Sequence, residues 1–481
     1  IINQGGSLPG TLAILFQARL GRSPERRRVV QAASVLGREF SLALLQRLLG
    51  QPSGLSETVT ALIDDGVLDR PGDGPTPQLR FRHALILEAV YQSLLLSDRR
   101  ALHSHAADVL ALHFAGDPMA APDILAHHQA VAQRFDEASR NLLAAGSAAA
   151  AHGAFQDAAA HARAGLANAA KLAESGEQRH LQRQLYTLLG MAVTATAGYA
   201  ADEVEQAYLA ARQLSRGDDD PVALFPIVRG LGTFNFVRAR FDEAQAIAVQ
   251  CVALAKAAGR TDFLIEALSF LGYTELYRGH VDAARAALED CVDRYRRENG
   301  ASFTYPSPQD AGTSALSLLP AAAWLQGDVG AADQRAAEAL AHARGLKRPI
   351  DEAYALVWIA MLRNLQRRHA EAIELSQACL AISQAHGFRT WLAAATMQQC
   401  FAAGALGPSE QAVGTLHYVL GEFKKAGAEA NEPYFLWGAA EGSMHLGQPD
   451  AARQALETAL QRTRVTGESY LRAELLLAQA R

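Results

Sequence analysis

The stretch Arg240-Phe241-Asp242-Glu243-Ala244 begins a pattern that recurs every 40 residues along the second half of the chain. Its closing alanine is matched by Ala284, and after a slip of eight residues the 40-residue spacing resumes. The later equivalents are Ala332, Ala372, Ala412 and Ala452. Eight residues after each of these six alanines the side chain is aliphatic. A fixed period of this size is typical of stacked supersecondary units, each too small to bury its own apolar face.

Each 40-residue unit has the pattern of two helices joined by a tight turn. In one copy, an apolar first helix around Phe263–Gly272 is followed by the turn Arg278-Gly279-His280. The second helix begins with Asp282, an acidic residue at the end where the helix dipole favours one. The pairs resemble tetratricopeptide repeats with a longer period, and less regular copies occur near 134–138 and 154–158. The sequence therefore predicts a mainly α protein containing an α-solenoid of tetratricopeptide-like helix pairs.

The first 115 residues do not follow the repeat. Helical patterns are followed by two short β-prone runs, Val67–Arg70 and Gln78–His83, which flank a Pro/Gly-rich turn at 71–77. The helices are predicted at 8–20, 24–37, 40–49 and 53–65, and after the β-prone runs at 84–96 and 99–114. Three helices and then a wing is the order of a winged-helix domain.

Three parts follow from these patterns. We expect a winged-helix domain at 1–115, irregular helical repeats at 116–195 and a tetratricopeptide-like superhelical sensor domain at 196–481. The chain starts at Ile1 rather than at a methionine, and Ser469–Leu476 has the pattern of the first helix of another repeat. We therefore expect the chain to be a piece of a larger protein.

Composition narrows the possible functions. The net charge is −5, and the candidate recognition helix Glu57–Asp65 has no Lys or Arg and ends in two aspartates. Duplex binding depends on neutralising phosphates, so direct binding of nucleic acid is not expected. No apolar run approaches the roughly 20 residues that a membrane span needs, and no signal peptide is visible, so the protein is predicted to be cytoplasmic with no membrane contact.

Several other features favour packing or surface roles over chemistry. Three of the four cysteines, Cys251, Cys291 and Cys379, share one slot of the repeat, which favours small packing positions over a disulfide or metal site. The histidines at 103, 105, 113, 127 and 128 do not share the i, i+4 spacing of helical metal ligands, so scattered packing and surface positions are predicted. Asp218–Asp220 and the insertion at 299–308 are interpreted as surface loops, although the insertion is also a candidate ligand-contacting loop. Aromatic residues on the first helices are expected to be mostly core, with those on the concave side forming the ligand surface.

Three segments carry a resemblance to a known family. They are Val35-Leu36-Gly37-Arg38-Glu39-Phe40, then Leu62-Ile63-Asp64-Asp65-Gly66-Val67-Leu68, then Phe81-Arg82-His83-Ala84-Leu85-Ile86-Leu87-Glu88-Ala89-Val90-Tyr91. Together they resemble the region after the ATPase core in bacterial STAND-type signal-transduction ATPases. That family includes AAA-like ATPases fused to class III adenylate cyclase domains and LuxR-type transcriptional regulators related to the maltose activator. The resemblance is specific from residue 8 to about 170 and looser beyond.

The resemblance implies a nucleotide switch in the full-length protein. In the family, the histidine that matches His83 contacts the phosphates of bound ADP, which implies this role for His83 with help from Arg82 or Arg80. ATP/ADP with Mg is implied for the full-length protein, with an ATPase domain upstream in the same chain as partner. An effector, either a protein or a small molecule, is implied on the concave face of the repeats, with oligomer formation on activation. A purely structural histidine is the alternative interpretation of His83.

The chain itself is not predicted to be an enzyme. It has no G-x-x-x-x-G-K-[ST] motif, and none of its five lysines follows a glycine. Without backbone amides that cradle phosphates and without a magnesium site, this segment is not expected to hydrolyse ATP. The alternative function is a free-standing repeat adaptor that gathers protein partners without any nucleotide.

Overall fold

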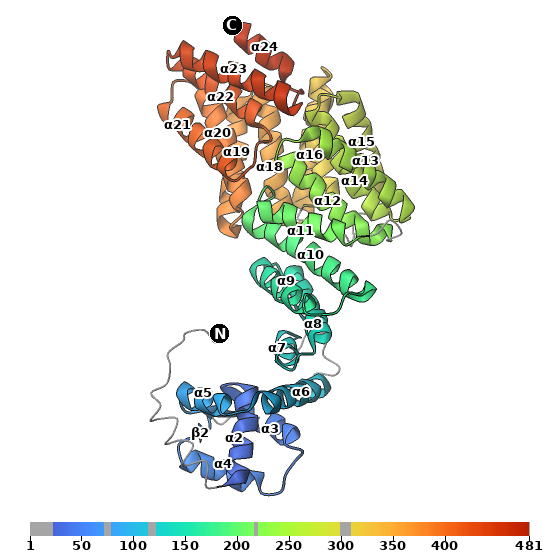
Figure 1. Cartoon of the computed structure of the whole chain (residues 1–481). Coiled ribbons are helices and arrows are strands. Elements are labelled where there is room, and N and C mark those ends of the chain that lie inside the picture. The colour runs from blue at the N-terminus through green and yellow to red at the C-terminus, as the bar shows by residue number, and fades with distance from the viewer. Residues whose placement is uncertain (1–22, 72–77, 114–121, 216–219, 299–308, 481) are drawn as a thin grey trace. The chain divides into compact units, whose positions relative to one another are not determined.

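The computed structural model describes residues 23–71, 78–113, 122–215, 220–298 and 309–480. Across these ranges it contains twenty-three helices and one three-stranded sheet, which confirms the mainly α prediction (Figure 1). The chain divides into two compact units, Ile1–Leu188 and Leu189–Arg481. The helix predicted at 8–20 and the insertion at 299–308 lie outside the described residues. No helix within these ranges is long and apolar enough to cross a membrane.

The first unit opens with helices around a small antiparallel sheet. The elements are α2 (Pro24–Leu36), β1 (Glu39–Ser41), α3 (Leu42–Leu48), α4 (Leu55–Asp64), β2 (Leu68–Asp69), β3 (Gln78–Phe81), α5 (Ala84–Gln92) and α6 (Leu96–His113). The strand order is β1-β3-β2, with Phe40 opposite Leu79 and Leu68 opposite Phe81. The inward side chains of this sheet join Val30, Leu45 and Leu62 in one buried cluster.

Strand β1 corrects one prediction. The sequence predicted a helix over 40–49, but α3 begins at Leu42 because residues 39–41 pair with β3. Phe40 packs its ring 6.0 Å from the ring of Phe81. Ser41 then caps α3, since its hydroxyl accepts a hydrogen bond from the Leu44 amide at 3.1 Å. The predicted helix over 84–96 is also divided, because α5 ends at Gln92 and α6 begins at Leu96.

Irregular helix pairs complete the first unit. They are α7 (Pro122–Val131), α8 (Phe135–Ala151), α9 (Phe155–Ala169) and α10 (Gly176–Ala197), and the boundary between the two compact units falls within α10. Helices α8 and α10 approach closely, since a Cβ added at Gly146 would lie 2.7 Å from a methyl carbon of Leu188.

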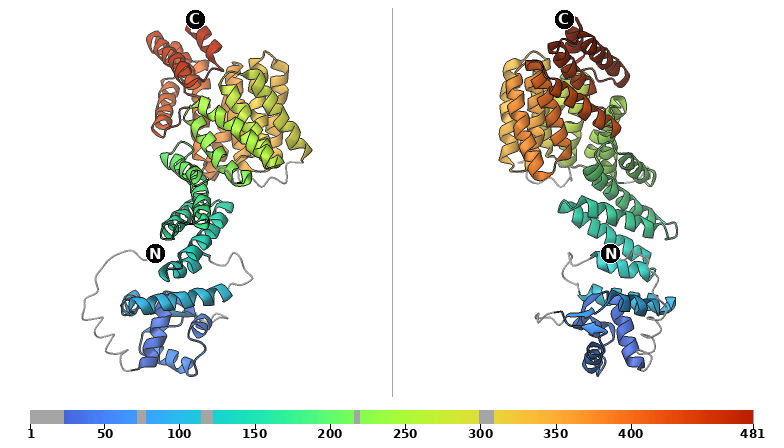
Figure 2. Two further views of the ribbon diagram at one scale, coloured as in Figure 1. Left: turned by 45° about the vertical axis from the view of Figure 1, so that its right-hand side comes forward. Right: turned by 90° about the vertical axis from the view of Figure 1, so that its left-hand side faces the viewer.

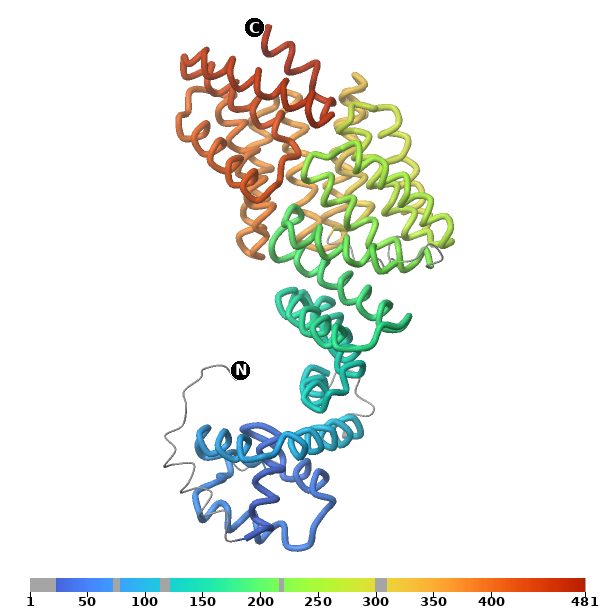
Figure 3. Tube along the Cα trace, viewed as in Figure 1, coloured from blue at the N-terminus to red at the C-terminus, as the bar shows by residue number. Residues whose placement is uncertain are grey.

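The second unit is a stack of antiparallel helix pairs, whose course can be followed in the Cα trace of Figure 3 and in the rotated views of Figure 2. After α11 (Asp202–Gln213), the first helices of the pairs are α12 (Pro221–Val237), α14 (Thr261–Tyr277), α16 (Ala311–Leu325), α18 (Pro349–Leu365), α20 (Arg389–Leu406) and α22 (Glu432–His445). The second helices are α13 (Phe241–Ala257), α15 (Val281–Arg297), α17 (Val329–Gly345), α19 (His369–His386), α21 (Glu410–Lys425) and α23 (Pro449–Thr466), and α24 (Arg472–Ala480) follows. The predicted solenoid of tetratricopeptide-like pairs is thereby confirmed.

The repeat positions have clear physical roles. All six marker alanines are buried in the second helices. Five residues before them, the turn adopts a left-handed conformation at Gly279, Gly327 and Gly447, with φ between +69° and +83°. The same turn position carries Ala239 and Arg367, also at positive φ, in the copies that lack glycine. Glycine recurs in this slot because it adopts positive φ without steric cost.

Two glycine substitutions test how tightly the helix pairs pack. A Cβ at Gly272 in α14 would stand 2.5 Å from Cγ of the buried Leu288. Gly272→Ala is expected to destabilise the C-terminal unit by about 1–3 kcal/mol through overpacking. Gly414 in α21 has open space around the same position, so Gly414→Ala is expected to stabilise it by up to about 1 kcal/mol. Urea unfolding of both variants checks this, and equal effects of the same sign would contradict the packing described here.

Candidate functional site

The first helices of the pairs form the inner layer of the second unit. In α18, 13 of 17 residues are buried, whereas in α19 only 5 of 18 are. Successive first helices pack on one another, α14 on α16, α16 on α18, α18 on α20 and α20 on α22. The ligand surface predicted on the concave side therefore belongs to this inner layer.

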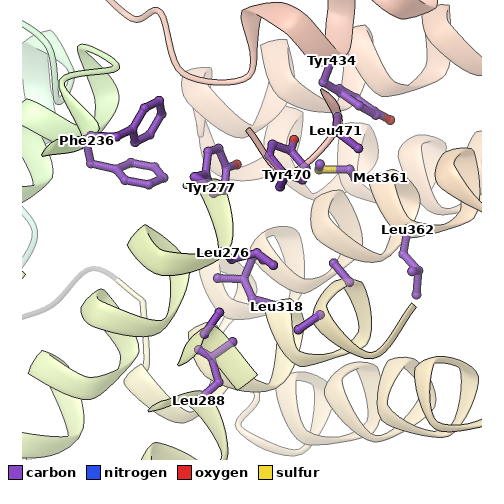
Figure 4. Packing of buried hydrophobic residues seen from close by; sticks show 14 of the residues in the cluster. Phe236, Leu276, Tyr277, Leu288, Leu318, Met361, Leu362, Tyr434, Tyr470 and Leu471 are labelled. Atoms are coloured by element: carbon purple, nitrogen blue, oxygen red, sulfur yellow. The ribbon is translucent and has the colours of Figure 1, made fainter. Parts of the chain in front are cut away.

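The inner layer closes on itself between residues far apart in sequence. The carbonyl of Tyr277, at the end of α14, accepts hydrogen bonds from the amides of Ser469 (2.8 Å) and Tyr470 (3.4 Å). Figure 4 shows the two tyrosine side chains lying next to each other, and their ring centroids are 4.9 Å apart. Residues 467–471, which connect α23 to α24, are thus held against the C-terminal end of α14.

A second connector makes a parallel contact. The carbonyl of Val237, the last residue of α12, accepts hydrogen bonds from the amides of Glu429 (2.8 Å) and Ala430 (3.1 Å). These residues belong to the 426–431 connector between α21 and α22. We call the contacts of both connectors with the ends of α12 and α14 the seam.

Asn431 holds the centre of the seam. Its Oδ1 accepts hydrogen bonds from the hydroxyls of Tyr277 (2.8 Å) and Tyr470 (3.0 Å). Its backbone has φ of +67°, a conformation that asparagine tolerates better than most residues. Burial raises the pKa of both tyrosines well above the usual value, so both hydroxyls remain donors.

Glu468 is a buried acid within the seam. The residue is 1% exposed, and its Oε2 accepts a hydrogen bond from the Asn431 amide at 3.2 Å. Its Oε1 has no hydrogen-bond partner among the described residues. Burial raises the pKa of Glu468 to about 8, against the opposing effects of the Asn431 amide and Arg462. The side chain is therefore protonated at neutral pH.

A buried ion pair lies elsewhere in the inner layer. The guanidinium of Arg229 in α12 is 2.8 Å from the carboxylate of Glu266 in α14 and donates a hydrogen bond to the hydroxyl of Tyr273 at 3.2 Å. The same guanidinium lies 4.3 Å from the ring centroid of Phe270. Burial raises the pKa of Glu266, and the charge of Arg229 opposes that rise. The pair links the first two inner helices and is already satisfied within the chain.

The aromatic residues of the first helices are mainly core, as predicted. Tyr277, Tyr434 and Trp437 are among the largest fully buried side chains. Trp358 in α18 is only partly buried and lies between Tyr277, at 6.4 Å, and Tyr354, at 5.9 Å between ring centroids. Its indole Nε1 has no hydrogen-bond partner within the described ranges. Because the Nε1 atom itself is buried, it could donate to a ligand only after the packing around Trp358 changes.

His83 and its neighbours occupy the junction between β3 and α5. His83 is exposed and stands at the N-cap of α5, but its side chain makes no capping hydrogen bond. Arg82 is also exposed, whereas Arg80 pairs with Asp69 through two hydrogen bonds of 3.1 Å. The expected help from Arg80 is therefore unsupported, because its guanidinium is already used within the hairpin.

The structure also brings together histidines that were predicted to be scattered. His103 of α6 and His128 of α7 are buried with their Nδ1 atoms 3.0 Å apart. His127 lies beside both, with ring centroids 5.7 and 5.6 Å away. Within the described parts of the chain, no group of three or more His, Cys, Asp or Glu side chains is arranged to hold a metal ion.

Comparisons with known proteins place the fold. No family model matches the chain. An uncharacterized protein of Rhizobium meliloti (strain 1021) is 24% identical over 489 aligned residues, which cover 96% of this chain and 45% of that protein. The chain thus spans less than half the length of this curated relative.

Solved structures match the helical repeats. A Rap protein complexed with Competence and Sporulation Factor has a TM-score of 0.50 at 12% identity, over 72% of this chain and 95% of that one. The Rap conjugation gene regulator of the plasmid pLS20, in complex with the Phr* peptide, has the same TM-score and identity, over 62% and 78%. A STAND protein with a tetratricopeptide repeat sensor from Pyrococcus horikoshii has a TM-score of 0.47 at 10% identity, over 98% and 67%. The two Rap proteins show that this chain has a tetratricopeptide-like repeat fold.

The seam can be tested at Asn431. Asn431→Gly keeps the positive φ accessible but removes the acceptor shared by two buried tyrosine hydroxyls. Each hydroxyl left unpaired costs about 1–3 kcal/mol, so a loss of about 2–6 kcal/mol is expected in urea unfolding of the C-terminal repeats. Tyr470→Phe removes one donor and leaves the other bond intact, so its loss should be only about 1 kcal/mol. Equal stability of Asn431→Gly and the wild type would show that the seam is not formed in solution.

Glu468 predicts a pH dependence of the same region. The pKa of Glu468 is about 8 when folded and about 4.3 when unfolded, so between these values the folded state holds one more proton. Stability therefore falls as pH rises from about 5 to 8, by on the order of 1 kcal/mol per pH unit at most. Glu468→Gln keeps an acceptor for the Asn431 amide and should lose this decline. Glu457→Gln, on the exposed face of α23, is the matched control and should retain it in melts recorded at pH 6, 7 and 8.

Proposed function

We propose that this chain is the regulatory and sensor portion of a nucleotide-switched signalling ATPase. In this proposal the repeats bind a protein or small-molecule effector, and His83 helps to hold an ADP-bound resting state. The observation that carries the proposal is the exposed, uncommitted His83 at the N-terminus of α5, within the segment that resembles STAND-type ATPases.

The element order supports a winged-helix assignment for the N-terminal region. The order α2, β1, α3, α4, β2, β3, with the hairpin strands antiparallel and β1 added beside β3, is the order that a winged helix requires. Helix α4, at the recognition position, has no basic residue in its Leu55–Asp64 sequence. A role in binding another domain of the same protein therefore fits this region better than a role in binding DNA.

The residues at the start of α5 are chemically suited to a diphosphate. His83 and Arg82 are both exposed, and each carries N–H groups that can donate hydrogen bonds to phosphate oxygens, for which a guanidinium is particularly suited. Gly66 leaves room for Arg82, since a Cβ there would lie 3.2 Å from Nη1 of that arginine. ADP would supply the negative charge that both side chains neutralise. ATP/ADP with Mg and an upstream ATPase domain belong to the full-length protein in this proposal.

Exposed leucines lie at both ends of the same helix. Leu85 is 55% exposed beside His83, and Leu95 and Leu96, after the end of α5, are 69% and 67% exposed. The adjacent pair Leu95 and Leu96 provides apolar surface that another protein could bury. The upstream ATPase domain is the partner proposed for this surface, and an oligomer would form only after activation.

A peptide is the effector class best supported by the fold. Both Rap structures that match the repeats contain a peptide or a signalling factor, and the first helices that would line such a site form the inner layer here. The partly buried Trp358 would provide apolar contact, and its buried indole Nε1 would become a donor only when the inner layer opened. A ligand shifts a conformational equilibrium only when it binds one of the two states more tightly than the other. A peptide effector would therefore have to bind a state in which the seam is open more tightly than the state in which the seam is closed.

The alternative is an adaptor without any nucleotide role. It is favoured because the repeat fold alone would account for such an adaptor, and because the sequence of this chain carries no phosphate-binding loop motif. In that case the inner layer would bind its peptide partner equally well with or without ADP.

The proposed role of His83 is tested in the full-length protein. His83→Ala should weaken ADP binding by about 10- to 100-fold, the range expected when one charge-assisted hydrogen bond is lost. His417→Ala, on the exposed face of α21, serves as the control and should leave ADP affinity unchanged in isothermal titration calorimetry. Identical ADP affinity of the His83→Ala variant and the wild type would remove the proposed contact. Absence of any ADP binding by the wild type would leave the adaptor as the function.

A further inference from the structure

A chain of hydrogen bonds connects three helices of the first unit. The hydroxyl of Tyr91 in α5 lies 3.0 Å from Nε2 of His103 in α6. Nδ1 of the same histidine lies 3.0 Å from Nδ1 of His128 in α7. His103 is 1% exposed and His128 is 3% exposed. The first helix of the irregular repeats is therefore connected to α5 and α6 by two buried imidazoles.

The distance between the two imidazoles limits their protonation. At 3.0 Å, one Nδ1 must donate its hydrogen and the other must accept it, so a single proton lies between them. A second proton would place two N–H groups face to face. The pair can therefore remain hydrogen-bonded when both imidazoles are neutral, but it cannot do so when both are charged.

The charges around the pair also oppose protonation. Arg99 of α6 lies over the Tyr91 ring at 4.3 Å, and His127 of α7 lies beside both imidazoles. Asp108 of α6 and Glu137 of α8 are both paired with Arg134, and Glu88 of α5, which acts on Tyr91, accepts a hydrogen bond from Gln92.

The other neighbouring helices do not change this balance. Helices α2 and α3 pack on a different part of α6, where Arg28, Leu102 and His105 line a pocket of about 300 Å³ together with residues 48–50. No carboxylate lines that pocket. Among the described residues, no carboxylate is hydrogen-bonded to His103 or His128 or contributes to their pKa shifts.

These surroundings lower the pKa of both histidines. Burial lowers the pKa of His103 to about 3, with further lowering by His128, His127 and Arg99. Burial lowers the pKa of His128 to about 4, with further lowering by His127. Both side chains are neutral across the physiological pH range while they remain packed.

We propose that His103 and His128 form a proton-sensitive joint that holds α7 against α6, and through Tyr91 connects it to α5, at neutral pH and releases it on acidification. The joint stands independently of the nucleotide role proposed for His83. It adds a physical connection, because His83 stands at the N-terminus of the same α5 helix that carries Tyr91. Opening of the joint would detach the irregular repeats from the helix that presents His83.

The direction and window of the pH effect follow from proton uptake. An opened, solvated histidine has a pKa of about 6.5, so below that value the open state binds protons that the packed state does not. The joint is fully stable above about pH 7 and weakens steadily as the pH falls towards 4. Because two histidines take up protons when the joint opens, the population of the open joint should rise roughly 600-fold between pH 7 and pH 5.

Hydrogen exchange of the whole 481-residue chain measures this opening. The readout is the exchange of amides in 122–131, corrected for the intrinsic effect of pH, at pH 7, 6 and 5. His128→Asn is the decisive variant, because the asparagine side chain can replace Nδ1 as a hydrogen-bonding partner of His103 but does not titrate. Its open population should rise only about 25-fold over the same range, the value for one remaining histidine. An equal rise in this variant and the wild type would overturn the proposal.

Two further variants keep the test interpretable. His105→Asn, an exposed position on the same helix, should retain the full response to pH. Tyr91→Phe should open the joint about 5- to 10-fold more at pH 7, as expected for one lost hydrogen bond, and still respond to acid. If His128→Asn fails to fold, an unchanged exchange rate in Tyr91→Phe would by itself refute the joint. Protection of 122–131 by micromolar Zn²⁺ at pH 5 would identify the pair as part of a metal site and would also overturn the proposal.

Discussion

The close approach of the two helices in each pair is the constraint on which the rest of the second unit depends. The thiol of Cys291 lies 3.3 Å from the carbonyl of Ile265, and the thiol of Cys379 lies 3.4 Å from the carbonyl of Ala353, in each case 26 residues earlier. Only small side chains fit at such positions, and the slot carries cysteine in three copies, alanine in two and valine in one. Because the second helix approaches so closely, the first helix is enclosed by its partner and by the neighbouring first helices. The inner layer and its seam follow from that enclosure.

The 40-residue period predicted the helix pairs because the same contacts, within each unit and between successive units, require similar residues at the same position of every copy. These contacts recur at the same spacing in every copy, as the marker alanines and the turn glycines show. The seam joins Tyr277 to Tyr470, which are 193 residues apart. That pairing depends on how far the stack curves with each unit, a small rotation that no single repeat position encodes. Strand β1 escaped prediction for a similar reason, since three residues become a strand only when β3 is beside them.

The sequence could indicate candidate site residues only where they are adjacent within one segment. His83 and Arg82 are adjacent in sequence at a strand-to-helix junction, and the structure leaves both exposed there. The pairing of Arg80 with Asp69, which lies opposite on β2, was not predicted, although this register could have been deduced by folding the two β-prone runs into a hairpin. The histidine pair had no such signal. Tyr91, His103 and His128 come from three helices and share no spacing, so only the packing of α5, α6 and α7 brings them together.

The energy scale of the seam makes it a suitable element for a switch under the proposed function. Five hydrogen bonds cross it, four from the connector amides and one from the Tyr277 hydroxyl to Asn431. At about 1 kcal/mol each, their net contribution is about 5 kcal/mol. Reversing a two-state equilibrium from 1:99 to 99:1 requires about 5.5 kcal/mol, and a ligand that binds one state alone supplies RT ln(1 + [L]/Kd). A peptide that bound only the opened inner layer would thus displace the seam once its concentration reached about 10,000 times its dissociation constant for that open state. A much larger closing energy would leave the inner layer inaccessible, and a much smaller one would leave it open without any effector.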